Sequence, residues 1–304
     1  MSDSAVQAAR PTVQKLPLDL AGYAAISLVV LIWAGFALSI RAMGSSPLAT
    51  ADVALIRFGI PSLALCLFLP SRWPSMRLIR PSDGLMILAG AGLPFFWLAA
   101  MGGAESSAAH VGALIAGTAP LSVALLSRLF GGPPSGWRRL AGLAVIAVGA
   151  FALVAGKAPG GNGNIVLGAA LLLGASLLWG TYTLALRRTA LDTIGCALLL
   201  AIPSFVVLLL LIVCGVVPAN LGHFSLGDAM PYILVQGLGS GIAASLAYAF
   251  AITRLGASRS AQIGSLAPVL TSLAAVPLLG ETLTPLLALG VVAITTGVIL
   301  ANRS

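Results

Sequence analysis

The sequence predicts an all-α polytopic membrane protein. Composition is the first reason, because 59% of its 304 residues are hydrophobic and only 8% are charged, whereas about a quarter of the residues in a soluble domain are charged. The mean hydropathy of +1.06 agrees with this. The second reason is that the apolar residues fall into ten separate runs. The third is that the arginines lie almost entirely in every second gap between those runs.

Each of the ten runs is long enough to cross a bilayer, which takes about 20 mostly apolar residues. The gaps are mostly short and contain Gly, Pro, Asn and Ser, which favour turns. No soluble domain is inserted, and we expect the first run to be retained because no small-residue cleavage site follows it. The predicted spans are 20–40, 50–69, 84–103, 107–127, 137–156, 164–186, 193–215, 229–252, 259–279 and 283–301.

The basic residues predict the direction of these spans, because cytoplasmic loops are enriched in Lys and Arg. If residues 1–18 form a cytoplasmic N-terminal tail, 13 of the 16 Lys and Arg residues are cytoplasmic, and so is the C-terminus. Arg41 and Lys157 would lie outside, and Arg57 within a span. These residues form no basic face, so no nucleic-acid partner is expected. The cytoplasmic set is Arg10, Lys15, Arg72, Arg77, Arg80, Arg128, Arg138, Arg139, Arg187, Arg188, Arg254, Arg259 and Arg303.

The two halves of the chain repeat one another. "LIWAGFALSIR" at 31–41 aligns with "LLWGTYTLALR" at 177–187, and "IPSLALCLFL" at 60–69 aligns with "IPSFVVLLLL" at 202–211. Four matches in the same order, at a nearly constant separation, indicate an internal repeat. The other two matches pair Ala119-Pro120 with Ala267-Pro268, Gly142 with Gly290, and Gly149 with Gly297.

We therefore expect two five-helix domains, at residues 19–156 and 164–301. Because five is an odd number, the second domain must enter the membrane in the opposite sense to the first. Many secondary transporters are built from such inverted-topology repeats. They bind their substrate near the middle of the membrane, between the repeats, and expose that site to the two sides alternately.

The block at 31–41, the arginine of the second span, the two Ala-Pro pairs and "PLLGETLTPLLALGVVAITTGVIL" at 277–300 resemble the EamA family of the drug/metabolite transporter superfamily. The resemblance covers nearly the whole chain, in two copies. It implies a multi-pass protein of the bacterial inner (plasma) membrane that exports small metabolites. Within the family, the similarity to YddG-type amino-acid exporters implies aromatic and other neutral amino acids as substrates. One departure is that Gly132-Pro133 in the first copy replaces Gly280-Glu281 of the second.

Arg57 is a charged residue inside a span, about 10 Å from the end of its helix at 1.5 Å per residue. The repeat gives it no counterpart, since Leu199 aligns with it. One hypothesis is that its guanidinium binds a substrate carboxylate, because charged groups in membranes usually face the protein interior. The alternatives are that the side chain reaches the outer interface or bonds to backbone carbonyls.

Aromatic and polar residues of four spans are candidates to line a substrate cavity together with Arg57. Aromatic rings there would surround an apolar side chain, and polar groups would orient the substrate. Trp33 and Trp179 occupy equivalent places in the repeat, although interfacial anchoring or helix packing also explains them. Close helix packing by neighbouring glycines is the alternative for the others. The set is Trp33, Phe95, Trp97, Trp179, Tyr182, Gln236, Ser240, Ser245 and Tyr248.

Pro94, Pro120 and Pro268 predict interruptions of the third, fourth and ninth spans, because a proline inside a helix removes a backbone hydrogen bond and kinks the helix. Such breaks are tolerated where neighbouring helices or a cavity satisfy the freed backbone groups. Paired breaks at matching places in two repeats point to the transport site. We therefore expect Pro120 and Pro268 to lie beside it.

No Asp or Glu lies deep in a predicted span, although buried carboxylates are the usual proton or sodium relays. Facilitative or weakly coupled transport is therefore expected. His110 is a candidate proton carrier, but a lone histidine at a helix end more often forms local hydrogen bonds. Glu281 is predicted to cap a helix starting near Thr282. Glu105 and Asp228, at other loop edges, are interpreted in the same way.

Other function classes have less support. ATP-driven pumping would need a GxxxxGKS or GxxxxGKT motif, which the sequence lacks. Cys66, Cys196 and Cys214 lie in apolar runs without a CxxC pair, so neither a metal nor a cofactor is expected. "GLGSG" around Ser240 is a weak serine-nucleophile motif, but both histidines are placed near the outer face, so no enzyme is expected. A passive pore for small solutes is the alternative to a carrier.

Overall fold

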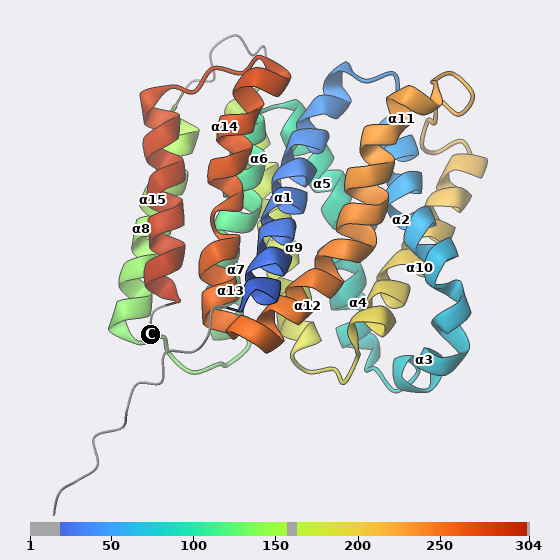
Figure 1. The fold of residues 1–304 in the computed structure, drawn as a ribbon, viewed down its shortest axis with the longest axis horizontal. Helices are drawn as coiled ribbons and strands as arrows, with labels where there is room; N and C mark the ends of the chain where they lie inside the picture. The colour runs from blue at the N-terminus through green and yellow to red at the C-terminus, as the bar shows by residue number, and fades with distance from the viewer. Residues whose placement is uncertain (1–18, 157–162, 303–304) are drawn as a thin grey trace, which may run out of the picture.

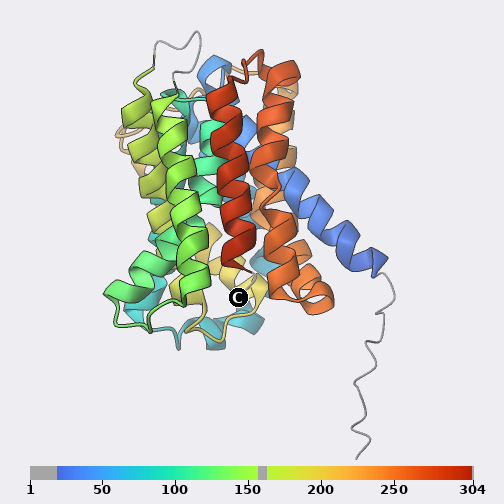
Figure 2. The same ribbon diagram turned by 90° about the vertical axis from the view of Figure 1, so that its left-hand side faces the viewer.

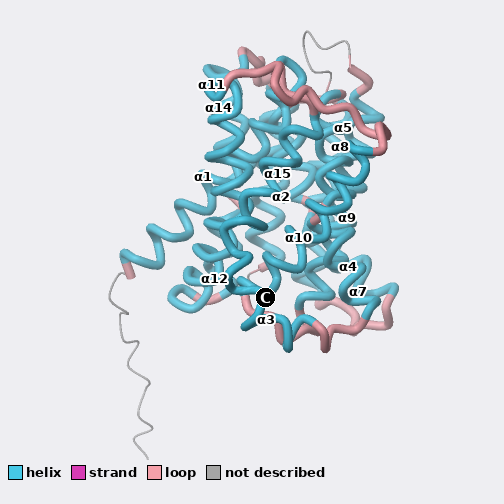
Figure 3. Tube along the Cα trace, turned by 90° about the vertical axis from the view of Figure 1, so that its right-hand side faces the viewer, coloured by secondary structure: helices cyan, strands magenta, loops and turns pink. Residues whose placement is uncertain are grey.

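The computed structural model describes residues 19–156 and 163–302, and every regular element within them is helical. The helices run between two opposite ends of the molecule (Figure 1), and the tube in Figure 3 contains no strand in the described part. The predicted all-α class is therefore confirmed for these residues. The cytoplasmic tail predicted for residues 1–18 lies outside the described residues, as do Arg10, Lys15, Lys157 and Arg303.

Nine helical segments of the described residues are long and apolar enough to cross a membrane. A tenth helix, α15 (Pro285–Ala301), has 17 residues and is shorter than these. Length and composition thus support nine spans, and the tenth stays a prediction. The nine are Leu20–Ser45, Thr50–Met76, Pro81–Ala104, Ala108–Leu129, Trp137–Ala155, Ile165–Leu186, Thr193–Val213, Leu226–Leu255 and Ala257–Leu279.

Three of the nine segments are single helices, α8 (Trp137–Ala155), α9 (Ile165–Leu186) and α10 (Thr193–Val213). The other six are composite. They are α1 (Leu20–Ala42) with η1 (Met43–Ser45); α2 (Thr50–Leu65) with η2 (Cys66–Phe68) and α3 (Leu69–Met76); α4 (Pro81–Ala91) with α5 (Leu93–Ala104); α6 (Ala108–Gly112) with η3 (Ala113–Gly117) and α7 (Ala119–Leu129); α11 (Leu226–Tyr232) with η4 (Ile233–Ala243) and α12 (Ala244–Leu255); and α13 (Ala257–Gly264) with α14 (Ala267–Leu279).

Polar caps begin several of the apolar helices. Asp19 and Asp192 accept hydrogen bonds from backbone N–H groups in the first turns of α1 and α10, and Asn164 and Thr284 do the same for α9 and α15. Each such cap contributes about 1 kcal/mol to helix stability. The caps fix where the helices start, although their interiors carry no amphipathic pattern to mark the ends.

The helix breaks lie where proline predicts them. α5 starts after Gly92 and carries Pro94 in its first turn, and Pro120 and Pro268 lie in the first turns of α7 and α14. Proline is favoured there because the first turn leaves its N–H groups unbonded. The spans are thus interrupted at these three prolines, and their role in gating stays a prediction. The π-helical geometry of η3 and η4 was not predicted, since π-helices of more than one turn are rare.

The second span is longer than the predicted 50–69. α3 continues it to Met76, although polar residues such as Ser71 and Arg72 end the apolar run. Pro70 lies in the first turn of α3, where its fixed backbone angle favours a new helical start. The error arose because hydropathy marks the apolar part of a helix and not its polar continuation.

The two ends of the molecule differ in charge. One, here called the arginine-rich end, contains most of the described basic residues. At the opposite end, here called the Glu281 end, Arg41 is the only described Lys or Arg. The charge asymmetry used to predict the topology is thus a property of the folded chain. The arginine-rich end contains Arg72, Arg77, Arg80, Arg128, Arg138, Arg139, Arg187, Arg188, Arg254 and Arg259.

Helices from the two halves of the chain pack against each other throughout the molecule. α8 lies along α15 at one edge, as Figure 2 shows. α2 lies along α10 near the other edge (Figure 1). Between these pairs, α1 packs against α12, and α4 and α5 pack against α9. The halves are therefore interleaved and do not form two separate bundles.

The close approach of α8 and α15 depends on four glycines. A Cβ added to Gly149 would lie 2.8 Å from the carbonyl oxygen of Gly290, and one added to Gly142 would lie 2.8 Å from that of Gly297. The contacts are reciprocal, because a Cβ added to Gly290 would lie 3.0 Å from the carbonyl oxygen of Gly149, and one added to Gly297 would lie 2.8 Å from that of Gly142. These are the glycines that align in the sequence repeat, and they meet in an antiparallel register.

The substitution Gly149→Ala is expected to destabilise the protein. The backbone of Gly290 would have to move, and overpacking costs about 1–3 kcal/mol, more than the roughly 1 kcal/mol gained in helix propensity. The midpoint of thermal unfolding in detergent should fall. Gly84→Ala in α4 is the matched control, because a Cβ there meets nothing within 4 Å. An equal or higher midpoint for Gly149→Ala than for Gly84→Ala would contradict the glycine-dependent contact.

Candidate functional site

Arg57 is buried where α2 meets η4. Its exposed fraction is 8%, and its Nη1 donates a 2.7 Å hydrogen bond to Oε1 of Gln236. The two residues belong to different halves of the chain. The side chain therefore turns into the protein in this conformation. It does not reach the outer interface, and it bonds to no backbone carbonyl of the described residues; these were the two alternatives that the sequence left open.

Gln236 is fixed by a second hydrogen bond. Its Nε2 donates to Oγ of Ser39 at 2.8 Å, and the Ser39 hydroxyl donates to the carbonyl oxygen of Phe36 at 2.8 Å. Because the Ser39 proton is directed at Phe36, the Ser39 oxygen is the acceptor for the amide NH₂. The amide oxygen of Gln236 must then face Arg57. This relay joins α1, α2 and η4.

The positive charge of Arg57 has no carboxylate partner among the described residues. Its Nε is buried and has no hydrogen-bond partner. Three rings face the guanidinium, with Cζ 5.0 Å from the centroid of Phe36, 5.7 Å from Phe58 and 5.8 Å from Phe96. Desolvated cation–π contacts contribute about 2 kcal/mol each, so the three rings offset part of the several kcal/mol that burying a charge costs, but they supply neither a counter-charge nor an acceptor for Nε. Arg57 is therefore an incompletely compensated charge with an unused donor.

A line of aromatic rings leads from this arginine to α9. Phe36 stacks on Phe95 with ring centroids 6.2 Å apart, Phe95 lies 5.4 Å from Trp179, and Trp179 lies 5.1 Å from Tyr182. The structure thus brings together three of the predicted aromatic residues, from α5 and α9. Sequence reasoning missed Phe36, although it lies in the repeated block at 31–41.

Three other predicted cavity residues, Trp33, Tyr248 and Ser245, lie outside the cluster around Arg57. Trp33 contacts Tyr248 with centroids 5.2 Å apart, in a separate small cluster between α1 and α12. Trp97 is half-buried against the main core. Ser245 is exposed and lines a pocket with an empty volume of about 200 Å³ between α10 and α12. The structure therefore divides the predicted set between three places.

Ser240 lies four residues after Gln236 in the π-helical segment η4. Its hydroxyl is buried and has no hydrogen-bond partner in the part of the chain that the structure describes. η4 approaches α2 closely here, because a Cβ added to Gly241 would lie 3.2 Å from the carbonyl oxygen of Arg57. Two buried polar groups without partners, Arg57 Nε and Ser240 Oγ, therefore occur on adjoining elements, which is unusual because buried polar groups are nearly always hydrogen-bonded.

A polar cluster that sequence reasoning missed lies beside Pro120. The Thr118 hydroxyl donates to Oγ of Ser176 at 2.9 Å, and Ser122 lies 2.9 Å from the same oxygen. These hydroxyls join the break between η3 and α7 to α9. No sequence pattern identifies them, because single Ser and Thr residues are common in apolar helices.

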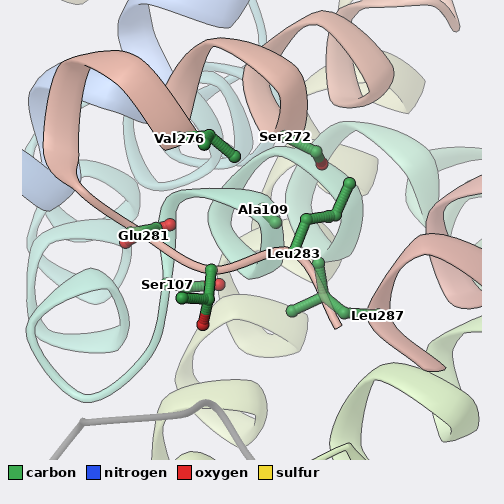
Figure 4. A pocket seen from close by; sticks show the side chains of 8 residues that line it. Ser107, Ala109, Ser272, Val276, Glu281, Leu283 and Leu287 are labelled. Carbon is green, nitrogen blue, oxygen red and sulfur yellow. The ribbon is translucent and has the colours of Figure 1, made fainter. Parts of the chain in front are cut away.

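Glu281 ties three elements together at its end of the molecule. Its Oε1 accepts from Nε of Arg41 at 3.1 Å, and its two oxygens accept from the backbone N–H of Ala108 at 3.1 and 3.0 Å. The contact joins α1, α6 and the loop before α15. Figure 4 shows Glu281 beside Ser107 at a pocket with an empty volume of about 180 Å³.

The predicted helix caps are corrected in two cases. Glu281 does not cap α15, because Thr284 accepts the N–H of the first turn at 3.3 Å. Glu105 accepts the N–H of Asn164 at 2.7 Å, across to the start of α9. Only Asp228 forms the expected cap, in a capping box at the start of α11. Within the described residues, no group of three or more His, Cys, Asp or Glu side chains is placed to hold a metal ion.

His110 is fully buried at the start of α6. Its Nδ1 lies 2.7 Å from Oγ of Ser107, and its Nε2 lies 3.0 Å from the carbonyl oxygen of Leu153. A carbonyl only accepts, so Nε2 carries a proton. Both nitrogens are thus used, Nε2 in a bond that attaches α6 to α8 and Nδ1 in a local bond to Ser107, the N-cap residue of α6. This geometry favours the structural alternative over the proton carrier.

Comparison with known proteins gives two findings. Residues 166–303 match the EamA-like transporter family. A crystal structure aligns over 93% of this chain and 94% of its own, with a TM-score of 0.61 and 21% identity; at that identity the likeness shows a shared fold. No curated protein matches. The family match includes Gln236 and Glu281, whereas Arg57 lies outside it.

Glu281→Gln is expected to loosen the Glu281 end, because it removes the charge that Arg41 and the N–H of Ala108 both contact. The reporter is Ala109→Cys, since Ala109 is 3% exposed and lines the pocket of Figure 4. Its maleimide reaction in detergent should accelerate roughly tenfold or more, since a tenfold change corresponds to about 1.4 kcal/mol and hydrogen bonds to charged groups contribute about 1.5–3 kcal/mol.

The reporter protein carries alanine in place of the native cysteines, Cys66, Cys196 and Cys214. Asp228→Asn is the matched control, because that carboxylate lies at the same end and bonds only to Ser225 of its own capping box. Equal labelling rates in the Glu281→Gln and Asp228→Asn proteins would show that Glu281 does not hold this end closed.

Proposed function

We propose that this chain is an EamA-like secondary transporter of small metabolites that carry a carboxylate. The best-fitting substrates are amino acids with aromatic or other neutral side chains, as for YddG-type exporters. The match of residues 166–303 to the EamA-like transporter family supports the transporter class, and the apolar helices support the membrane location. On this proposal, the chain acts as a carrier and not as an enzyme.

The observation that carries the proposal is the state of Arg57. A bound carboxylate would supply the missing negative charge and an acceptor for the unused Nε. Charge-assisted hydrogen bonds of this kind are about twice as strong as neutral ones. The line of rings from Phe36 through Phe95 to Trp179 offers apolar surface for a side chain next to that charge.

We also propose that residues 19–156 and 164–301 are inverted-topology repeats. If each helix is replaced by its counterpart in the other half, α1 takes the place of α9, and α12 takes the place of α4 and α5. The packing of α1 on α12 then corresponds to the packing of α9 on α4 and α5, while the α2–α10 and α8–α15 pairs stay the same. The breaks at Pro120 and Pro268 exchange in the same way. This correspondence supports two copies of one fold inserted in opposite senses.

Alternating access then follows from an asymmetry between the two ends. Leu48, Asp52 and Tyr232 at the Glu281 end are 3%, 1% and 4% exposed, which supports a closed Glu281 end. The repeat aligns Arg187 with Arg41 and Pro133 with Glu281, so the arginine-rich end lacks this acid. We propose that the Glu281 end is the outer one, closed in this conformation, and that it opens when the arginine-rich, cytoplasmic end closes.

The proposal includes facilitative or weakly coupled export across the inner membrane of a bacterium. The described carboxylates occupy caps, first turns or loops, at Asp19, Asp52, Asp83, Glu105, Asp192, Asp228 and Glu281. A proton or sodium relay usually needs such a group deep in the membrane. The bonded state of His110 also speaks against proton transfer through that ring.

Counterflow in liposomes tests the proposal. Vesicles preloaded with unlabelled phenylalanine, tryptophan or leucine should transiently accumulate the labelled amino acid above its equilibrium level, because a carrier exchanges substrate and a pore does not. Arg57→Gln should slow the initial rate by roughly tenfold or more, since hydrogen bonds to charged groups contribute about 1.5–3 kcal/mol.

Arg77→Gln is the matched control, because Arg77 is an exposed arginine at the arginine-rich end. Its counterflow should equal that of the wild type. Unchanged counterflow in the Arg57→Gln protein would refute the role of Arg57. Equilibration without accumulation in the wild type would identify a pore.

A further inference from the structure

We infer that Gln236 is the residue that makes this site select carboxylates. Its neutral amide holds Arg57 in place without neutralising it, so the charge stays available to a bound anion. The inference rests on the proposed function for the identity of the natural substrate. Anion selection itself can be measured without transport.

The geometry of the pair is that of an ion pair from which one charge has been removed. The Arg57 Nη1 to Gln236 Oε1 distance of 2.7 Å is within the usual range for an arginine–carboxylate hydrogen bond. Glutamate has nearly the same shape as glutamine and would place a carboxylate oxygen at the same position. If the only role of residue 236 were to stabilise the buried guanidinium of Arg57, glutamate would do so more strongly than glutamine, because a buried charge is stabilised by an opposite charge.

The orientation of the amide reinforces this role. The hydrogen bond to Ser39 directs the NH₂ of Gln236 away from Arg57, so the amide presents only its oxygen to the guanidinium. One donor of Arg57 is therefore occupied and the side chain is held, while its Nε stays without a partner. Gln236 is thus a positioning residue, and Arg57 is the group that touches the ligand.

In this inference, the hydroxyl of Ser240 is the second donor to the carboxylate. It lies four residues after Gln236 on η4, and it is the other buried side-chain group without a partner in the described residues. Its hydroxyl and the Arg57 Nε are both donors. A carboxylate has two oxygens that accept, whereas a carboxamide has one oxygen and an NH₂ that would face a donor. The pattern therefore favours the acid over its amide.

The test uses the full-length protein in detergent, with 3-phenylpropionate and its neutral analogue 3-phenylpropanamide as probes. In the wild type, the acid should raise the thermal midpoint and the amide should not. Gln236→Glu should raise the midpoint without ligand, because the new carboxylate pairs with Arg57. Its affinity for the acid should be roughly tenfold weaker or worse, with the preference for acid over amide lost.

Matched variants separate charge from size and position. Gln262→Glu adds a carboxylate at the arginine-rich end, where Gln262 bonds to Ser258, and should keep the wild-type response. Gln236→Asn should retain the preference for the acid and Gln236→Asp should lose it, so the comparison holds even if Gln236→Glu folds poorly.

Two results would overturn the inference. One is an equal midpoint shift with the acid in the wild-type and Gln236→Glu proteins, and the other is a wild type that does not distinguish the acid from the amide. Failure of the proposed transport function looks different, because counterflow would be absent while acid binding and its loss in Gln236→Glu persist.

Discussion

The hydrogen bond between Arg57 and Gln236 is the interaction on which the rest of this structure depends. It joins the two halves of the chain across the contact of α2 with η4, and through Ser39 it extends to α1. It also keeps a charge inside an apolar core at a cost that three phenyl rings only partly offset. A ligand with a negative charge would remove that remaining cost, and this links the stability of the site to its occupancy.

The helices are arranged symmetrically, while the charges are not. The reciprocal contacts of the α8 and α15 glycines and the matched breaks at Pro120 and Pro268 fit two copies of one fold. Arg57 aligns with Leu199 and Glu281 with Pro133, so each charged group occurs in one copy only. In our proposal, the symmetric helices allow two conformations of similar energy, and the unpaired charges determine which end closes and what binds.

Much of the fold could be predicted from the sequence, because apolar length and proline position are properties of local sequence. The positions of Phe95, Trp179 and Tyr182 near one another also followed from the choice of aromatic residues in those spans. The partners of Arg57 and Glu281 could not be predicted, since they lie 179 and 240 residues away in sequence. The rotation of a helix about its axis decides which of its polar residues faces a neighbouring helix, and the π-helical geometry of η4 changes that rotation.

The most direct test of the central claim is a crystal structure of the protein with 4-bromophenylacetate bound, in which anomalous scattering locates the bromine. We predict a carboxylate within hydrogen-bonding distance of Arg57 Nε, and the bromine beside the rings of Phe36, Phe95 and Trp179. The hydrogen bond between Arg57 and Gln236 should be retained. Bromine density elsewhere in the molecule, with Arg57 Nε still lacking a partner, would contradict the account.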